Sequence, residues 1–262
     1  MPTLVTEQGI VHYETYGRGR PVILLHGWLG SWALWRKTIE ELGKYFRTYA
    51  LDFFGFGDSL DRSSDFSVSN YVDVVYQFMD RLGIVKAPLV GHSMGGTVSL
   101  GVAARYPEKV VKVIVIGSPV MGTSLNFFLK LSGYKGIADL VFAMPFMLDS
   151  FVYGITHLAA NDGAALHRMV SQDAAKVTAD SFFQSIGTLR DTDMREQLPL
   201  MQMPLLGIYG RKDIIVHPMQ GKHLVKFAPH GREAWFHNSG HFPMLDEPHR
   251  FFNTVNDFLH NG

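Results

Sequence analysis

The segment APLVGHSMGGTVSLGVAARYP, residues 87–107, decides the fold. It begins with an apolar run, and its later residues have the composition of a helix that Pro107 stops. Between these two parts lies GHSMGG, in which Ser93 falls where a strand gives way to a helix. A sharp turn there has no room for side chains beside the serine, which explains Gly91 and Gly95. The turn also lifts the hydroxyl above the carboxyl edge of the sheet. The alternative is an ordinary glycine-rich turn, so the rest of the chain decides whether Ser93 is reactive.

Strands and helices alternate on both sides of this segment. The runs PVILLHG (21–27), RTYALDF (47–53) and VVKVIVIGS (110–118) are typical of strands buried on both faces. Helical spacing is found at residues 31–46 and 67–83. The alternation predicts an α/β fold in which helices flank a mostly parallel sheet.

The alternation stops after Ser118 and returns near residue 199. Residues 119–198 contain no clear strand and are rich in Phe, Met and Leu at helical spacing. Strand patterns then recur in MPLLGIYG (203–210) and REAWFHN (232–238), before a closing helix at 247–260. We therefore expect a core domain formed by residues 1–118 and 199–262. A helical cap of residues 119–198 is inserted after its sixth strand.

Composition excludes several classes of function. The 262 residues are 47% hydrophobic, which is enough for a substantial core, and Lys+Arg and Asp+Glu balance at 24 each. A net charge of zero gives no electrostatic reason to expect nucleic acid or an anionic membrane as partner. The absence of cysteine excludes disulfides, thiolate catalysis and cysteine-bound metals. With no signal-peptide pattern and no apolar run of about 18 residues, we expect a cytoplasmic protein without a membrane span.

A reactive serine needs a base, and the base needs an orienting acid. In WFHNSGHFPMLDEP, His241 lies past a strand end and can reach over the sheet, whereas His237 continues the strand. Asp213 follows the buried strand LLGIYG, while the loop after VVKVIVIGS holds no acid. The alternatives are a surface-loop role for His241 and a helix N-cap for Asp213, and the second is compatible with catalysis. A zinc pair of His237 and His241 is disfavoured, because NSG between them argues against a helix.

Acyl transfer also needs donors for a developing oxyanion. We expect these donors to be the backbone N–H groups of Met94, just after the serine, and of Trp28 in HGWLGS. Gly27 would let the backbone approach closely, and His26 would hydrogen-bond the loop in place. His92 occupies the variable position of the serine motif and is assigned no role.

Taken together, the motifs HGWLGSWALW, LDFFGFGDS, GHSMGG, YGRKD and SGHFPMLDEP resemble those of the α/β-hydrolase superfamily, in its order of nucleophile, acid and histidine. The resemblance is to small, capped serine carboxylesterases and covers nearly the whole chain outside the cap. It implies Ser93 as nucleophile, Asp213 as orienting acid and His241 as general base, with no cofactor and no metal. Haloalkane dehalogenases and most epoxide hydrolases of this fold have an aspartate where Ser93 stands, so they are excluded.

The expected reaction is hydrolysis of small, uncharged carboxylic esters with short to medium acyl chains. The aromatic and methionine side chains of the cap suggest an apolar pocket, for which we select Phe142, Met144, Phe146 and Phe242. The expected partner is the small-molecule ester alone, with the chain a monomer or weak homo-oligomer. Alternatives are a ligand sensor of the same fold with slow turnover, a C–C bond hydrolase and a cofactor-free perhydrolase.

Overall fold

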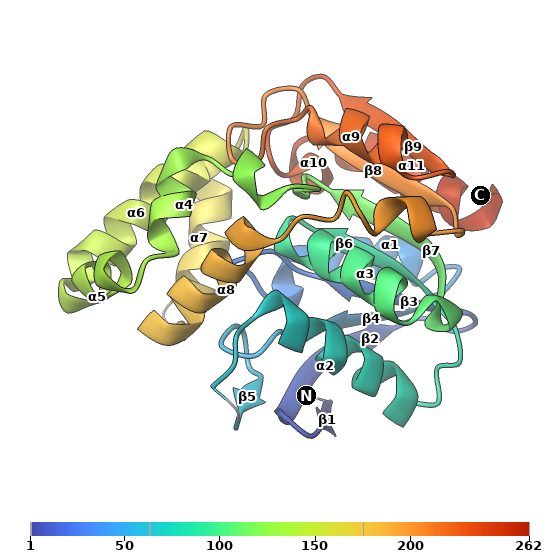
Figure 1. Cartoon of the computed structure of the whole chain (residues 1–262), viewed down its shortest axis with the longest axis horizontal. Coiled ribbons are helices and arrows are strands. Elements are labelled where there is room, and N and C mark those ends of the chain that lie inside the picture. The colour runs from blue at the N-terminus through green and yellow to red at the C-terminus, as the bar shows by residue number, and fades with distance from the viewer. Residues whose placement is uncertain (1, 63, 175, 262) are drawn as a thin grey trace.

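A nine-stranded sheet forms the centre of the computed structural model, which describes residues 2–62, 64–174 and 176–261 (Figure 1). The spatial order is β1-β2-β4-β3-β6-β7-β8-β9, and the short β5 pairs with β2. The strands are β1 (Thr3–Val5), β2 (Gly9–Tyr16), β3 (Pro21–Leu25), β4 (Arg47–Leu51), β5 (Leu60–Asp61), β6 (Ala87–His92), β7 (Val110–Ile116), β8 (Leu205–Gly210) and β9 (Gly231–Phe236).

The sheet is parallel from β4 to β9, and only the pairings made by β2 are antiparallel. The predicted mostly parallel α/β sheet is confirmed. Because parallel strands end at the same edge, the loops after β3, β6, β8 and β9 come together there.

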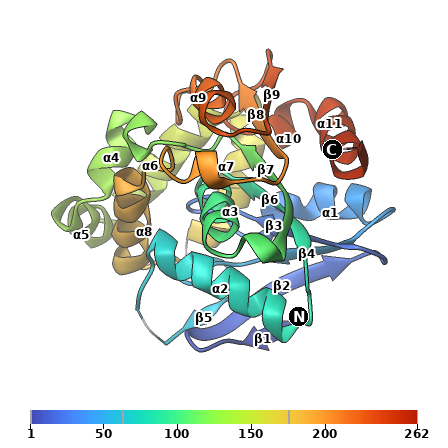
Figure 2. The same ribbon diagram turned by 45° about the vertical axis from the view of Figure 1, so that its right-hand side comes forward.

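Helices cover both faces of the sheet, and the alternation of side chains along β3 shows why. Ile23 and Leu25 point into one apolar core with α2 (Val68–Arg81) and α3 (Met94–Arg105). Val22 and Leu24 point into a second core with helices of the opposite face. Figure 2 shows the sheet between these two layers. The helices outside residues 119–198 also include α1 (Arg36–Leu42), α9 (Gln220–Phe227), α10 (Pro243–Asp246) and α11 (Pro248–Asn261), with 3₁₀ turns η1 (Trp32–Trp35) and η2 (Pro107–Lys109).

The chain between β7 and β8 is helical, and its described residues form no named strand. The insertion therefore follows the seventh strand and not the predicted sixth, because the two-residue β5 has no visible strand pattern in the sequence. The helices of this region, here called the inserted helices, lie together at one side of the sheet (Figure 1). They are α4 (Phe127–Ser132), α5 (Lys135–Ala143), α6 (Pro145–Ala159), α7 (Gly163–Ala174) and α8 (Ala179–Asp191), flanked by the 3₁₀ turns η3 (Gly122–Ser124) and η4 (Leu198–Leu200).

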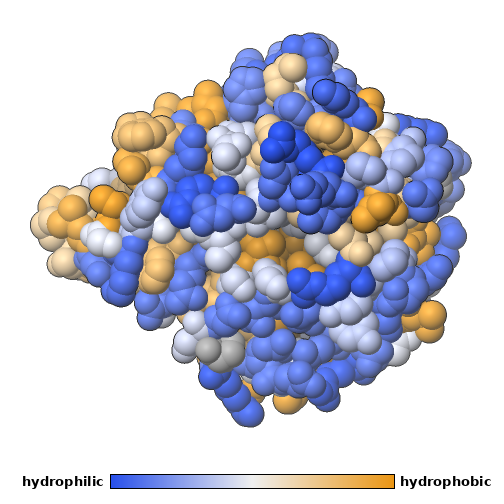
Figure 3. Space-filling view, viewed as in Figure 1, coloured by the Kyte–Doolittle hydropathy of each residue, from blue (hydrophilic) through white to orange (hydrophobic). Residues whose placement is uncertain are grey.

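The outer surface of the inserted helices carries many apolar side chains. Figure 3 shows hydrophobic side chains gathered at the left, over α4 to α6. The exposed ones are Phe127, Phe128, Tyr134, Ile137, Leu140, Phe146, Tyr153 and Leu158. Among the described residues no single helix could cross a membrane by length and apolarity. The pair α5 and α6 passes that test only together, with a bend of 110° between them.

Candidate active site

Ser93 lies in a strained turn between β6 and α3. Its φ of 51° and ψ of −117° fall in a region that side-chain-bearing residues rarely adopt. A Cβ atom at Gly91 would collide with the carbonyl of Gly95, and one at Gly95 would collide with the carbonyl of Leu25 on β3. The turn is therefore packed against itself and against β3 so closely that only glycine fits on either side of the serine.

Asp213 and His241 meet at the carboxyl edge of the sheet. Asp213 lies in the loop after β8 and His241 in the loop after β9, and His241 Nδ1 donates to Asp213 Oδ2 at 2.8 Å. The other carboxylate oxygen, Oδ1, accepts from the backbone N–H groups of Ile215 and Val216 at 2.8 and 3.0 Å. Both side chains are buried. This arrangement fixes the imidazole with its proton on Nδ1, which leaves Nε2 free to accept a proton.

Asp213 is not a helix N-cap, the alternative role considered for it from the sequence. The next helix, α9, has Met219 at its N-cap, and Asp213 instead closes a local turn with its backbone partners. His237, expected to continue the strand, stands exposed just after β9.

Ser93 and His241 line the same pocket. Within the described residues no hydrogen bond joins the Ser93 hydroxyl to the imidazole, although Asp213 already orients the ring. Such contacts are often long in enzymes without bound substrate and shorten when the reacting groups assemble.

The side chain of His26 holds the start of the loop after β3. The buried His26 donates from Nδ1 to the carbonyl of Gly27 at 2.7 Å and accepts at Nε2 from the N–H of Phe53 at 2.9 Å. Burial lowers the pKa of His26, so the ring is neutral, as these two bonds require. The loop then turns through Leu29, whose φ is 57°. Among residues 2–62, 64–174 and 176–261, three non-glycine residues have positive φ, and two of them are Leu29 and Ser93.

Two backbone donors remain unused beside the serine. In the described part of the chain, the N–H groups of Trp28 and Met94 donate to no protein acceptor. Met94 is the first residue of α3, where an N–H has no partner within the helix and the helix dipole favours negative charge. The Trp28 indole Nε1 donates to the carbonyl of Phe182 on α8 at 3.1 Å, which anchors this side chain to the inserted helices.

His92 is a site residue that sequence reasoning missed. Its Nε2 donates to the backbone carbonyl of His241 at 3.0 Å, and its ring packs 4.7 Å from the ring of His241 and 4.6 Å from that of Phe242. Burial, and then the neighbouring His241, hold the pKa of His92 well below its usual range. Only its place at the end of a buried strand, next to the serine, could have pointed to such a contact.

The pocket above Ser93 contains about 510 Å³ of empty space, including solvent at its mouth. Phe242 lines the pocket, as expected from the sequence, whereas Phe142, Met144 and Phe146 do not. Phe142 packs on Phe182 with ring centroids 5.4 Å apart, Met144 precedes α6, and the side chain of Phe146 is 68% exposed. The inserted helices contribute other residues to the pocket: Leu129 of α4, Val152, Ile155, Thr156 and Ala159 of α6, and Leu166 and Val170 of α7.

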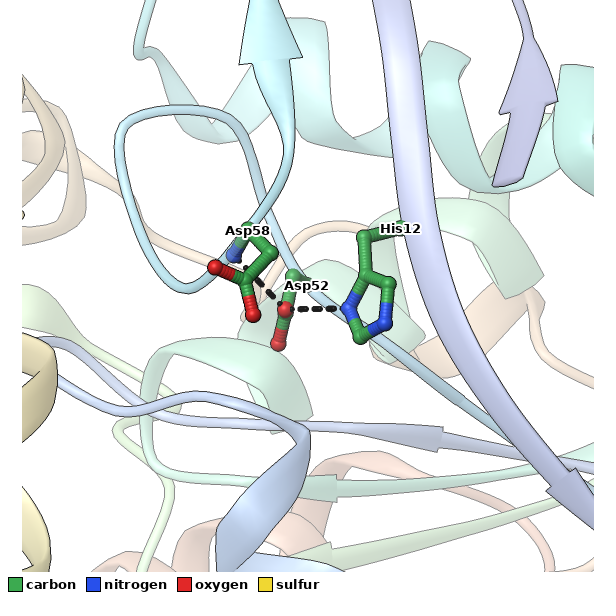
Figure 4. A group of neighbouring side chains, drawn as sticks. All are labelled: His12, Asp52 and Asp58. Atoms are coloured by element: carbon green, nitrogen blue, oxygen red, sulfur yellow. Dashed lines mark hydrogen bonds and ion pairs between the residues drawn. The ribbon is translucent and has the colours of Figure 1, made fainter. Parts of the chain in front are cut away.

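One cluster away from this pocket has metal-ligand side chains, namely His12, Asp52 and Asp58 (Figure 4). Its potential ligand atoms lie within 4.8 Å of one another, and several of them have hydrogen-bond partners, although the buried Nε2 of His12 has none among the described residues. Asp52 accepts from His12 Nδ1 at 2.7 Å and from the backbone N–H groups of Trp32 and Asp58 at 2.6 and 2.9 Å. Asp58 pairs with Lys176. These contacts fit a hydrogen-bonded cluster, buried at His12 and Asp52 but not at Asp58, that ties the loop after β3 to the end of β4.

Comparison with known proteins agrees with this fold. A sequence model of the α/β-hydrolase fold family matches residues 20–131. A pimeloyl-[acyl-carrier protein] methyl ester esterase of Vibrio campbellii is 28% identical over 259 residues, covering 95% of this chain and 98% of that protein.

Solved structures share the architecture over nearly the whole chain. A thermophilic esterase from Thermogutta terrifontis aligns with a TM-score of 0.85 at 21% identity, covering 98% of this chain and 96% of that one. A meta-cleavage product hydrolase from Pseudomonas fluorescens aligns with a TM-score of 0.83 at 24% identity, covering 99% and 97% of the two chains.

Proposed function

Since the chain is an esterase-like protein with the α/β-hydrolase fold, we propose that it hydrolyses carboxylic esters through a covalent acyl-enzyme on Ser93. The observation that carries this proposal is the pairing of His241 with Asp213, 2.8 Å apart, in the pocket that Ser93 also lines. A carboxylate that orients a neutral imidazole beside a serine is the arrangement that general-base activation requires.

In the proposed reaction, Ser93 Oγ attacks the ester carbonyl carbon while His241 Nε2 takes the hydroxyl proton. The negative charge that develops on the carbonyl oxygen is stabilised by the N–H groups of Trp28 and Met94, which have no other acceptor in the described structure. The C–O bond to the alcohol then breaks, and His241 returns its proton to the leaving alcohol. Water, deprotonated by His241, attacks the acyl-enzyme, and the acid leaves as Ser93 regains its proton.

The inserted helices are proposed to act as a cap that selects the substrate. In this division residues 1–118 and 199–262 form the catalytic core domain and residues 119–198 form the cap. The described residues that line the pocket include no Asp, Glu, Lys or Arg, and the hydroxyl of Thr156 already donates to carbonyls of α6. An apolar pocket without charged groups favours uncharged esters with short to medium acyl chains. The relative that acts on a methyl ester adds methyl esters to the substrates worth testing.

The proposal is tested with p-nitrophenyl esters from acetate to octanoate and with methyl esters of the same acids. Continuous turnover on the uncharged esters, abolished in Ser93→Ala, supports an esterase. A single slow release of product per chain would favour a ligand sensor. Turnover of a C–C ring-cleavage substrate at a rate above that for every ester would favour a C–C bond hydrolase. Faster turnover with added hydrogen peroxide than any ester shows in water would favour a cofactor-free perhydrolase.

A further inference from the structure

The loop that carries the catalytic histidine is bonded directly to the cap. The N–H of His241 donates to the carbonyl of Ala159, the last residue of α6, at 2.7 Å. Two residues further on, the side-chain amide of Asn161 donates to the carbonyl of Asn238 at 2.9 Å. The backbone position of His241 is therefore set from the cap as well as from the sheet.

Asp246 strengthens this connection by bridging the two segments. One carboxylate oxygen, Oδ1, accepts from the N–H of Asn161 beyond the end of α6 at 2.8 Å. The other, Oδ2, accepts from the N–H of Gly240, the residue before His241, also at 2.8 Å. Hydrogen bonds to an ionised carboxylate are roughly twice as strong as those between neutral groups. Asp246 thus binds the cap with one oxygen and the histidine loop with the other.

The backbone of the histidine loop is closely packed where it meets α6. A Cβ atom at Gly240 would collide with the carbonyl oxygen of Ala159, and one at Gly210, at the end of β8, would collide with the carbonyl of Gly240. The histidine loop is therefore held between β8 and the end of α6. A small shift of α6 along its axis has to move either the loop or the hydrogen bonds of Asp246.

The same helix forms the wall of the pocket. Val152, Ile155 and Ala159 of α6 line the space above Ser93, and Ala159 also accepts the N–H of His241. An acyl chain that fills this space presses on the helix whose end holds the base. Pocket occupation and base position are thus linked through one rigid element and a short set of hydrogen bonds.

We propose that Asp246 is a positioning residue. It fastens the end of α6 to the histidine loop, so that an acyl chain in contact with α6 determines the position of His241. The inference rests on the proposed function of the pocket and goes beyond it, because it assigns the cap a part in catalysis as well as in selection.

The test compares Asp246→Asn with Glu247→Gln. Glu247 is a matched control, because its carboxylate accepts from Asn238 N and Ser239 Oγ of the same loop but is bonded to no described residue of the cap. Both variants replace a carboxylate by an amide of the same size. kcat and KM are measured over p-nitrophenyl esters from acetate to octanoate, for the two variants and the unmodified protein.

In the unmodified protein, kcat should rise from acetate to the ester that fills the α6 side of the pocket. In Asp246→Asn that rise should be lost, and kcat on the best ester should fall by about tenfold. Displacement of a reacting group by a fraction of an ångström reduces the rate by about this much. KM should change less than kcat. Glu247→Gln should change kcat by the same factor for every acyl chain length. Asp246→Glu should recover part of the lost rise.

The inference is overturned if Asp246→Asn lowers kcat by one common factor for all esters, as Glu247→Gln does, or only lowers the melting temperature. If Asp246→Asn does not fold, Asn161→Ala is used instead, because it removes the bond to Asn238 from an exposed side chain. Asn161→Ala should lose part of the rise in kcat with acyl chain length. Labelling by a fluorophosphonate separates the two proposals. An unmodified protein that is neither labelled nor active overturns the proposed function, whereas a labelled, active protein with an unchanged chain-length profile in the variants overturns only this inference.

Discussion

Gly27 lies so close to His92 that a Cβ atom at position 27 would stand 2.8 Å from Nδ1 of His92 and 3.1 Å from Cβ of Ser93. The loop that carries the proposed donor Trp28 is thereby packed directly on the turn that carries the nucleophile. The two backbone donors can share one oxyanion only while this contact between the loop and the turn is kept.

Gly27→Ala should therefore reduce kcat by about 10²-fold with a smaller change in KM, since the inserted methyl group displaces Trp28 relative to Ser93. Steady-state kinetics on p-nitrophenyl butyrate provide the measurement. Gly136→Ala on α5 is the control, because a Cβ atom there meets nothing within 4 Å. It should leave kcat unchanged. Unchanged kcat in Gly27→Ala would contradict the assignment of the oxyanion loop.

Asp213→Asn should lower kcat by up to ~10⁴, the size of effect known for the orienting acid of serine-protease triads. The amide can no longer accept the Nδ1 proton of His241 while keeping its bonds to Ile215 and Val216. Activity within tenfold of the unmodified protein would show that another group orients the base.

Ile155→Ala should shift the preferred acyl chain to a longer one, because the residue lines the pocket from α6. A methylene gained or lost in an apolar pocket changes discrimination by only ~1–3 kcal/mol, so the profile should shift without abolishing activity. Phe146→Ala, on the same helix but 68% exposed, is the control and should leave the profile unchanged. If Phe146→Ala shifts the profile and Ile155→Ala does not, the pocket has been placed on the wrong side of α6.

His12 should make stability depend on pH above the ordinary histidine range. Its hydrogen bond and ion pair with Asp52 raise the pKa of His12 above 6.5. Because the folded state then binds the proton more tightly than the unfolded state, the stabilisation is complete below pH 6.5 and is lost as pH rises through the folded-state pKa. Urea unfolding at pH 6 and pH 9 should show this loss, and His12→Gln should reduce it. Burial of His26 and His92 lowers their pKa values, so these two residues reduce stability as pH falls below 6.5. They do so equally in the unmodified protein and in His12→Gln.

The fold and the meeting of Ser93, Asp213 and His241 could be predicted because they depend on local patterns. Buried strands, the glycines around the serine and the loops after β8 and β9 are all visible along the chain, and a parallel sheet brings its strand ends to one edge. The resemblance to α/β-hydrolases then indicated the roles of these residues. No such pattern indicated the role of His92, because its bond goes to the backbone carbonyl of His241, an acceptor that every residue carries.

The pocket residues of the inserted helices could not be predicted for a different reason. Apolar residues occur around the whole circumference of α6, with Phe146 facing solvent and Ile155 facing the pocket. When both faces of a helix are apolar, its periodicity does not show which face is turned inward, and only the packing of α6 on its neighbours decides. The bridge made by Asp246 is hidden likewise, because it joins an ordinary acidic residue to backbone N–H groups.

The central claim is that Ser93 is the nucleophile, and mass spectrometry of the fluorophosphonate-treated protein tests it most directly. Trypsin releases Ser93 in the peptide 87–105, which also contains Ser99, so fragment masses distinguish the two serines. The account predicts one phosphonyl group per chain, on Ser93, with loss of ester turnover in proportion to labelling and no label in Ser93→Ala. A label on another residue, or full turnover by Ser93→Ala, would contradict it.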